Sequence, residues 1–181
     1  MSISFDHHAV RTAADSVRIQ RLLPGPIERV WDYLVDSDKR RLWLAAGEMV
    51  LEAGAPVELV FRHEELSEPP ATPPARPADM RGGHRNAGRI TLCEPPHLLG
   101  YTWAENHGDP SEVRFDLERR GDDVLLTVTH TRLPGNDALH SVAGGWHAHL
   151  DLLGRRLRDE PVGDFRAACE TMHRAYAARM P

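Results

Sequence analysis

Cysteine is scarce in this sequence, and long apolar runs are missing altogether. The two cysteines, Cys93 and Cys169, stand far apart and form no Cys-x-x-Cys pair. We therefore expect neither a disulfide framework nor a structural zinc site, and a reducing, cytoplasmic setting is the expected one. No apolar run approaches the roughly 18 residues that a membrane-spanning helix needs. The polar N-terminus lacks the apolar core of a secretory signal.

An excess of positive charge and the common catalytic motifs are also missing. The chain carries 22 Lys and Arg against 27 Asp and Glu, so its formal net charge is −5. Without a broad basic surface, neither nucleic acid nor an anionic membrane is an expected partner. There is no HExxH, GxSxG or Walker-type motif, so the sequence predicts no metal site, no catalytic residue and no cofactor. The 181 residues, 41% hydrophobic and 27% charged, fit one globular domain.

The chain is expected to begin with a flexible lead, a strand and a helix. Residues 1–15 show no periodic pattern, whereas residues 16–23 alternate apolar and polar side chains, which predicts a first strand. Pro26 is tolerated in the first turn of a helix, and a helix is predicted over residues 27–36. Its apolar stripe consists of Ile27, Val30, Trp31 and Leu34.

A second, short helix and two short strands are predicted next. The helix covers residues 38–44, with Leu42 and Trp43 facing the interior. The two strands cover residues 49–54 and 56–63, on either side of an Ala-Gly-Ala-Pro turn.

The middle of the chain combines a proline-rich segment with a series of strands. Residues 64–86 contain five of the 14 prolines and no apolar period, which predicts a long mobile loop. Four more strands are predicted over residues 88–94, 98–104, 112–119 and 124–132. Their short separators favour an antiparallel meander.

Two helices are predicted at the C-terminal end. The first covers residues 137–158, with the apolar stripe Val142, Trp146, Leu150, Leu153 and Leu157. Pro161 separates it from a helix over residues 163–179, with the stripe Phe165, Cys169, Met172 and Tyr176. The second stripe needs cover from this domain or from a second copy, so a homodimer through this helix is one expectation.

Histidines in the first of these helices raise the question of a metal or catalytic site. His147 is four residues before Asp151, and we expect these two residues and Arg155 to form a solvated, charge-paired face. His149 is expected nearer the apolar stripe. His130 falls on the apolar face of its strand, where a histidine satisfied by a hydrogen bond is the main interpretation and ligand contact the alternative.

Gly144 and Gly145 in the same helix predict a kink or a close approach to the sheet, with clearance for a ligand as the alternative.

Four stretches resemble one known family. They are PGPIERVWDYLVDSDKRRLW, AGRITLCEPPHLLGYTW, EVRFDLERRGDDVLLTVTHTRLP and GWHAHLDLLGRRL. Together they are similar to the START-like, helix-grip (SRPBCC) superfamily, and within it to bacterial relatives of the activator of the heat-shock-protein-90 ATPase. The resemblance covers residues 16–158, and residues 159–181 form a helical extension. It implies an α+β fold in which a curved antiparallel sheet of six to seven strands wraps around the long C-terminal helix, with two short helices after the first strand.

The resemblance also implies a cavity between the sheet and the long helix that takes a small, largely apolar molecule. The expected ligand-binding residues are Leu92, Tyr101, Trp103, Phe115, Val128, His130, Trp146, His149 and Leu150. The loop over residues 64–86 is longer than the usual connection of the family and is expected to cover the cavity mouth. The tail after Pro161 lies outside the family's core and is expected to cover one end of the cavity or to form a dimer contact.

Two other functions are implied by the superfamily. One is a cyclase or dehydratase-like enzyme in which His130 or His149 is the general acid–base, assisted by Glu105 or Arg114. The other is regulation of a chaperone ATPase.

Overall fold

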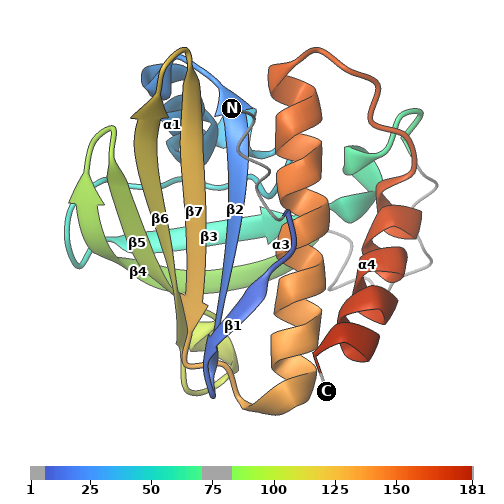
Figure 1. Cartoon of the computed structure of the whole chain (residues 1–181). Coiled ribbons are helices and arrows are strands. Elements are labelled where there is room, and N and C mark those ends of the chain that lie inside the picture. The colour runs from blue at the N-terminus through green and yellow to red at the C-terminus, as the bar shows by residue number, and fades with distance from the viewer. Residues whose placement is uncertain (1–6, 71–82, 181) are drawn as a thin grey trace.

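The chain folds into one curved antiparallel sheet around a long helix (Figure 1). This computed structural model describes residues 7–70 and 83–180. The sheet order is β1-β2-β7-β6-β5-β4-β3. The strands are β1 (Val10–Ala13), β2 (Ser16–Pro24), β3 (Pro56–Phe61), β4 (His84–Glu94), β5 (Leu98–Trp103), β6 (Ser111–Arg120) and β7 (Asp123–Thr131). The predicted α+β, helix-grip architecture is confirmed.

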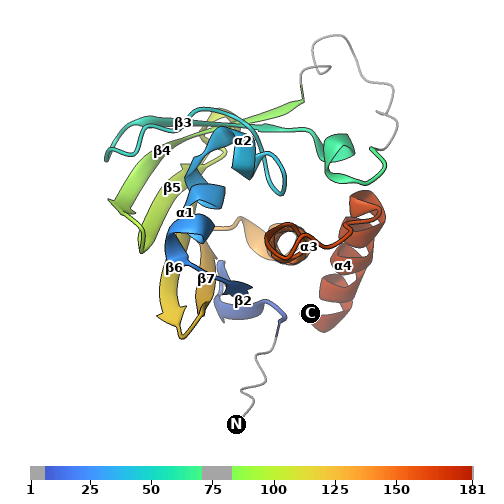
Figure 2. The same cartoon turned by 90° about the horizontal axis from the view of Figure 1, so that it is seen from above.

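Helices occupy the concave side of this sheet. They are α1 (Ile27–Val35), α2 (Ser37–Arg40), α3 (Gly135–Leu157) and α4 (Phe165–Arg179), with single 3-10 turns at η1 (His63–Leu66) and η3 (Glu105–His107). Figure 2 shows α3 end-on, with the curved sheet on one side and α4 on the other. The long helix is therefore enclosed between two layers.

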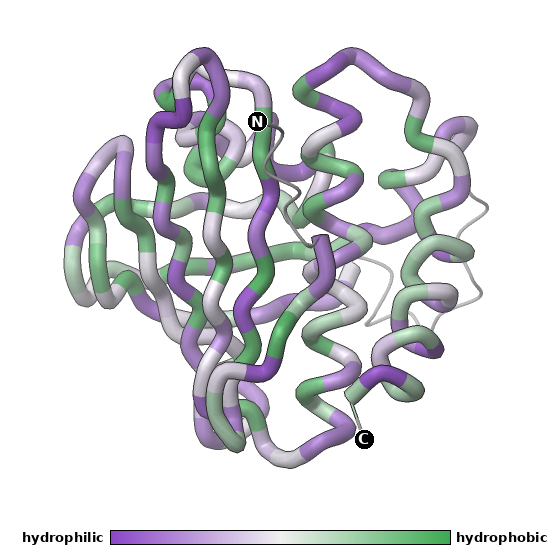
Figure 3. The backbone as a smooth tube through the Cα atoms, viewed as in Figure 1, coloured by the Kyte–Doolittle hydropathy of each residue, from purple (hydrophilic) through white to green (hydrophobic). Residues whose placement is uncertain are grey.

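Hydrophobic and hydrophilic residues alternate along the strands (Figure 3). This alternation places the hydrophobic side chains on the inner face of the sheet. Val113 and Phe115 of β6 lie opposite His130 and Val128 of β7, and all four side chains are buried. Because successive strand residues point to opposite faces, these positions form one continuous surface toward α3. Burying each apolar side chain of this kind contributes roughly 1.5–3 kcal/mol.

The predicted stripe on α3 faces that surface. Trp146, Leu150, Leu153 and Leu157 are all buried, and Val142 at the N-terminal end is half-buried. The spacing of three and four residues places these side chains on one side of the helix, so the stripe fixes how α3 is rotated against the sheet.

The short helix predicted over residues 38–44 ends at Arg40 instead. The fully buried Arg40 side chain donates hydrogen bonds to the carbonyl oxygens of Leu34, Val35 and Ala45. These bonds fold the chain back beneath α1, because one guanidinium satisfies carbonyl groups on both sides of the turn. Trp43 is buried as predicted, but Leu42 is exposed, so its predicted inward direction is wrong.

Three other sequence-based boundaries differ from the structure. Residues 10–13, assigned to the flexible lead, pair with β2 as β1. The strand predicted over residues 49–54 is reduced to an isolated bridge between Met49 and Val57. Strand β4 begins at His84, within the predicted loop, because β3 provides a pairing partner for its first residues. Residues 64–66 of that loop belong to the 3-10 turn η1, and residues 71–82 lie outside the described residues.

Helix α4 packs against α3 of the same chain. Phe165 and Tyr176 at its two ends are buried, so this domain itself covers much of the predicted stripe. A Cβ atom on Gly144 would lie 2.4 Å from the His173 ring and 2.9 Å from the His173 backbone nitrogen. The close approach predicted at Gly144 is therefore made to α4, and not to the sheet. A homodimer through α4 stays a prediction.

Within the described part of the chain, no helix is long and apolar enough to cross a bilayer.

Candidate functional site

A pocket of about 340 Å³ lies between the sheet, α3 and α4. Its lining residues come from β3, β4, β5, β7, both C-terminal helices and the turns beside them. They are Leu44, Phe61, His63, His84, Asn86, Trp103, His130, Ser141, Val142, Gly145, Trp146, His149, Cys169 and His173. Small-molecule sites usually enclose about 300–1,000 Å³, so this volume suits a small ligand.

Aromatic side chains form the inner wall of this pocket. The ring of Trp103 lies 5.7 Å from that of Phe61 and 5.7 Å from that of Trp146, measured between centroids. Phe115 supports Trp146 from behind, with the two rings nearly perpendicular at 5.6 Å. Trp103 is only half-buried, whereas Phe115 is fully buried. Trp103 therefore presents part of its apolar ring surface to the pocket, where a flat ligand would contact it.

His130 is fixed by two hydrogen bonds inside the protein. Its Nδ1 accepts the indole N–H of Trp146 at 3.0 Å, so that nitrogen carries no proton. Its Nε2 lies 2.8 Å from Ser111 Oγ and donates to it in the neutral ring. Burial lowers the pKa of His130 from 6.5 to about 3, which keeps the ring neutral. Both nitrogens are used, as the main interpretation of a satisfied histidine requires.

Among the described residues, a hydrogen bond holds the His149 ring at one nitrogen only. Its Nδ1 lies 2.6 Å from the carbonyl oxygen of Trp43, and because a carbonyl can only accept, Nδ1 carries the proton. Burial lowers the pKa of His149 to about 3, and the nearby His63 and His173 lower it further, against the raising effect of the Trp43 carbonyl. The ring is therefore neutral, with a lone pair on Nε2.

Gly145 provides space at the pocket wall. A Cβ atom built on this residue meets nothing within 4 Å, although it lies in the middle of α3. The neighbouring Gly144 is explained by the approach of α4, whereas Gly145 agrees with the alternative of clearance for a ligand.

The structure separates the nine predicted ligand-binding residues into three groups. The four that line the pocket are Trp103, His130, Trp146 and His149. Four others, Tyr101, Phe115, Val128 and Leu150, are almost completely buried and belong to the packed core. They face the interior as predicted, but close packing leaves them no open surface toward this pocket.

The predicted inward direction of the ninth residue, Leu92, is wrong. Leu92 is 37% exposed and lies on the outer face of the sheet. The register between β4 and β5 shifts between Ile90 and Leu92, so Ile90 is the buried residue there. A β-bulge of this kind interrupts the two-residue alternation on which the prediction for Leu92 depended.

Several lining residues were not predicted from the sequence. His84 and Asn86 stood in the segment interpreted as a loop, and Cys169 and His173 belong to α4, beyond the resemblance. Only the apolar stripe of α4, which includes Cys169, gave a signal that this helix would cover part of the interior.

The helper residues of the enzyme hypothesis lie elsewhere. Glu105 accepts a hydrogen bond from Thr102 Oγ1 and pairs with Arg89, and it does not line the pocket. Arg114 is half-exposed on β6 and forms a bidentate pair with Asp116. No group of three or more metal-binding side chains occurs among residues 7–70 and 83–180.

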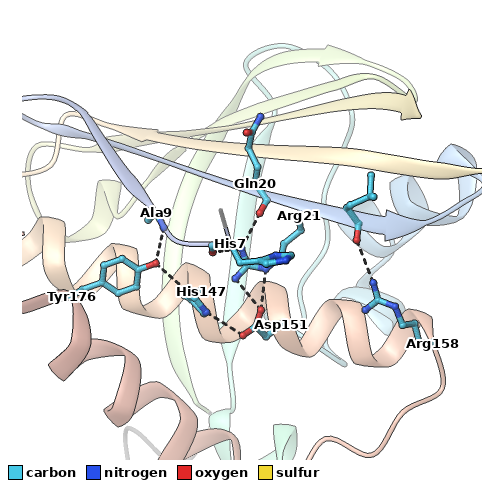
Figure 4. A network of polar contacts seen from close by, with 9 residues as sticks. His7, Ala9, Gln20, Arg21, His147, Asp151, Arg158 and Tyr176 are labelled. Carbon is cyan, nitrogen blue, oxygen red and sulfur yellow. Dashed lines mark hydrogen bonds and ion pairs between the residues drawn. The ribbon is translucent and has the colours of Figure 1, made fainter. Parts of the chain in front are cut away.

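A second cavity, of about 530 Å³, lies on the other side of α3, between β2 and α4. A network of polar contacts borders this cavity (Figure 4). Tyr176 Oη accepts the Ala9 N–H at 2.6 Å and lies 2.9 Å from His147 Nδ1. His147 Nε2 is 3.2 Å from Asp151 Oδ2, and Arg21 Nε donates to Asp151 Oδ1 at 2.9 Å. These polar contacts therefore join α4, α3, β2 and the N-terminal segment.

This arrangement corrects the prediction of a solvated face. His147 pairs with Asp151 as expected but is buried, because α4 and the N-terminal segment cover it. Burial raises the pKa of Asp151, but the His147 and Arg21 contacts outweigh burial and the net pKa is lowered. Arg155 does not join them, since it donates to the carbonyl oxygen of Pro161.

A curved sheet closed around α3, with an aromatic pocket between them, defines a START-like, helix-grip protein, a fold suited to binding ligands. Residues 24–158 match the family of activator of Hsp90 ATPase homolog 1-like proteins, and the chain belongs to this family. Helix α4 lies outside the matched residues. No match is found among proteins of curated function.

Solved structures of similar proteins agree. A Bordetella parapertussis protein studied by NMR is 43% identical, with a TM-score of 0.78, and the match covers 97% of this chain and 91% of that chain. The protein CalU16 of Micromonospora echinospora is 24% identical, covering 90% and 86%, with a TM-score of 0.65. DynU16, from the dynemicin biosynthetic locus, is 20% identical, covering 83% of this chain and 50% of that chain, with a TM-score of 0.64. The last two show the fold alone.

Proposed function

We propose that this protein binds a small, largely apolar, aromatic molecule in the pocket between the sheet and α3. The observation that carries the proposal is the half-buried Trp103, held between Phe61 and Trp146 with part of its ring toward the open volume. Binding covers apolar surface that the folded chain itself leaves uncovered, which is favourable at roughly 25 cal/mol per Å² of that surface. Both cysteines are free thiols, which supports a cytoplasmic setting as part of the proposal.

The larger cavity beside β2 is less suited to such a ligand. Its lining includes Arg21, Asp151, Arg155, Arg158 and Glu160. Four of these side chains are already engaged: Arg21 and Asp151 with each other, Arg155 with the Pro161 carbonyl and Arg158 with the Leu22 carbonyl. An apolar molecule there would remove water from charged groups without replacing their hydrogen bonds, which is costly. The chemistry of the lining, and not the volume, distinguishes the two sites.

Substitution of Gly145 tests the proposal without disturbing the core. Gly145→Leu places an apolar side chain in the pocket, and Gly145→Ala adds only a methyl group to the open space. Both replacements favour the helix over glycine by up to about 1 kcal/mol, so the folded state should be retained. Ala177→Leu, at an exposed position of α4 outside the pocket, is the matched control.

The measurement is thermal or urea unfolding in the presence of a library of neutral aromatic molecules. A ligand at 100 times its Kd should stabilise the wild type by about 2.7 kcal/mol. We expect the same shift in Ala177→Leu, a similar one in Gly145→Ala, and none in Gly145→Leu. The proposal fails when no library member stabilises the wild type, or when Gly145→Leu responds to the same ligands as fully as the wild type does.

A further inference from the structure

Two polar atoms of the aromatic pocket have no hydrogen-bond partner among the residues that the structure describes. The first is His149 Nε2. The Nδ1 atom of the same ring is occupied by the Trp43 carbonyl, and the two ring nitrogens point in nearly opposite directions. Within the described chain, the completely buried side-chain nitrogen and oxygen atoms that lack a hydrogen bond are Arg21 Nη2 and Thr91 Oγ1. His149 Nε2 is not one of them, so this atom is accessible from the open volume of the pocket that the ring lines.

The second atom is the amide nitrogen of Asn86. The backbone N–H of Ala104 donates to Asn86 Oδ1 at 2.7 Å, which identifies that atom as the oxygen and the other as Nδ2. Asn86 is buried, with only 4% of the residue exposed, and it lines the pocket. Its Nδ2 donates to no described residue and is not among the completely buried atoms either. Asn86 therefore offers a donor to the pocket.

Backbone groups fix both roles. The Trp43 carbonyl holds the His149 proton on Nδ1 and leaves Nε2 as an acceptor, and the Ala104 N–H holds the Asn86 amide with Nδ2 as a donor. Neither side chain can exchange its role without breaking a bond to the backbone. Because a ligand that fills the pocket removes water from these two atoms, a ligand that supplies hydrogen-bond partners is favoured over one that leaves them unpaired.

The lining also restricts the charge of the ligand. It contains no Asp, Glu, Lys or Arg among the residues that the structure describes. A charged ligand would lose its hydration without gaining an ionic partner, which favours a neutral molecule. The flat faces of Phe61, Trp103 and Trp146 favour a planar aromatic one.

We infer that the pocket selects neutral, planar aromatic molecules that carry a hydroxyl group and a carbonyl group, the hydroxyl donating to His149 Nε2 and the carbonyl accepting from Asn86 Nδ2. This inference rests on the proposed function and specifies the ligand class for the same site. His149 and Asn86 are then the residues that determine specificity, and the tryptophans supply the apolar contact.

Two pairs of probes separate the two contacts. For His149, 2-naphthol is compared with 2-methoxynaphthalene, which has the same rings but no hydroxyl proton. For Asn86, 2-acetylnaphthalene is compared with 2-isopropenylnaphthalene, which has a similar shape but no acceptor. We expect the wild type to bind the first member of each pair about fivefold to tenfold more tightly, the usual effect of one hydrogen bond. Isothermal titration gives each Kd.

One variant addresses each contact. His149→Asn retains a donor near the position of Nδ1, for the Trp43 carbonyl, but has no atom at the position of Nε2. Asn86→Asp retains the oxygen that accepts from Ala104 and replaces the donor with an acceptor. Each variant should lose the preference within its own probe pair and keep the preference within the other pair. The two variants are thus controls for each other.

A measurement on the wild type does not depend on either variant folding. A long-range proton–nitrogen NMR spectrum should show His149 with its proton on Nδ1, and 2-naphthol should shift the Nε2 resonance more than 2-methoxynaphthalene does. A proton on Nε2 in the free protein would overturn the inference.

The remaining outcomes are distinct. Equal affinity for both members of each pair would overturn the inference and leave aromatic binding intact. A preference that persists in the corresponding variant would overturn the assignment to that residue. If none of the four naphthalenes binds the wild type up to its solubility limit, the proposed function fails and the inference fails with it.

Discussion

Lowering the pH should destabilise this protein well before its carboxylates become protonated. His130 and His149 are both buried, and burial lowers the pKa of each from 6.5 to about 3 in the folded chain. Below pH 6.5 the unfolded chain binds a proton at each site and the folded chain does not. The stabilisation is therefore fully present above about pH 6.5 and is lost as the pH falls toward 3.

The magnitude follows from these values. One pKa unit corresponds to about 1.4 kcal/mol, so between pH 7 and pH 5 each histidine should lower the free energy of unfolding by about 2 kcal/mol. Together they amount to about 4 kcal/mol, a large part of the roughly 5–15 kcal/mol that stabilises a typical domain. Most carboxylates titrate below this range.

Urea unfolding at pH 7, 6 and 5 measures the loss, and NMR titration of the two imidazole rings assigns it. Both rings should keep the signals of neutral histidine at pH 5 while the folded state persists. A change of less than about 1 kcal/mol between pH 7 and pH 5, or an imidazole signal from either residue that titrates near 6.5, would refute the reasoning.

Two further predictions concern the attachment of α4. Tyr176→Phe removes the hydroxyl that contacts Ala9 N–H and His147, so we expect a loss of about 2–4 kcal/mol in urea unfolding. Tyr33→Phe is the control, and equal losses in the two variants would contradict this role of Tyr176. Gly144→Ala should increase hydrogen exchange in α4, because the added methyl group meets the His173 backbone. Unchanged exchange there would show that α4 does not depend on this approach.

For Phe115, Val128 and Trp103 the direction of the side chain could be predicted from the sequence, but whether open space lies in front of it could not. Phe115 and Val128 face the interior as their strands predicted, yet they are packed, whereas Trp103 borders the pocket. Periodicity reports which face a residue occupies. Open space depends on the sizes of all the neighbouring side chains, which come from distant parts of the chain.

Other differences have their own physical causes. Leu92 was misplaced because a bulge in β4 shifts the alternation by one residue, and no local sequence signal marks that bulge. Asn86 was missed because its stretch of β4 is polar and follows a proline-rich segment, so its strand character comes from pairing with β3. His147 was predicted on a solvated face because its cover, α4, is far away in the sequence.

The sequence by itself determined where strands β2 to β7 lie along the chain, the apolar stripe of α3 and the family to which the chain belongs, since these depend on short-range patterns along the chain. Only the tertiary structure decided which histidine retains an available nitrogen. His130 and His149 are alike in the sequence and both are buried, but Trp146 and Ser111 occupy both nitrogens of the first, and the Trp43 carbonyl occupies one nitrogen of the second. Those partners are brought together by folding, and they determine what each ring can bind.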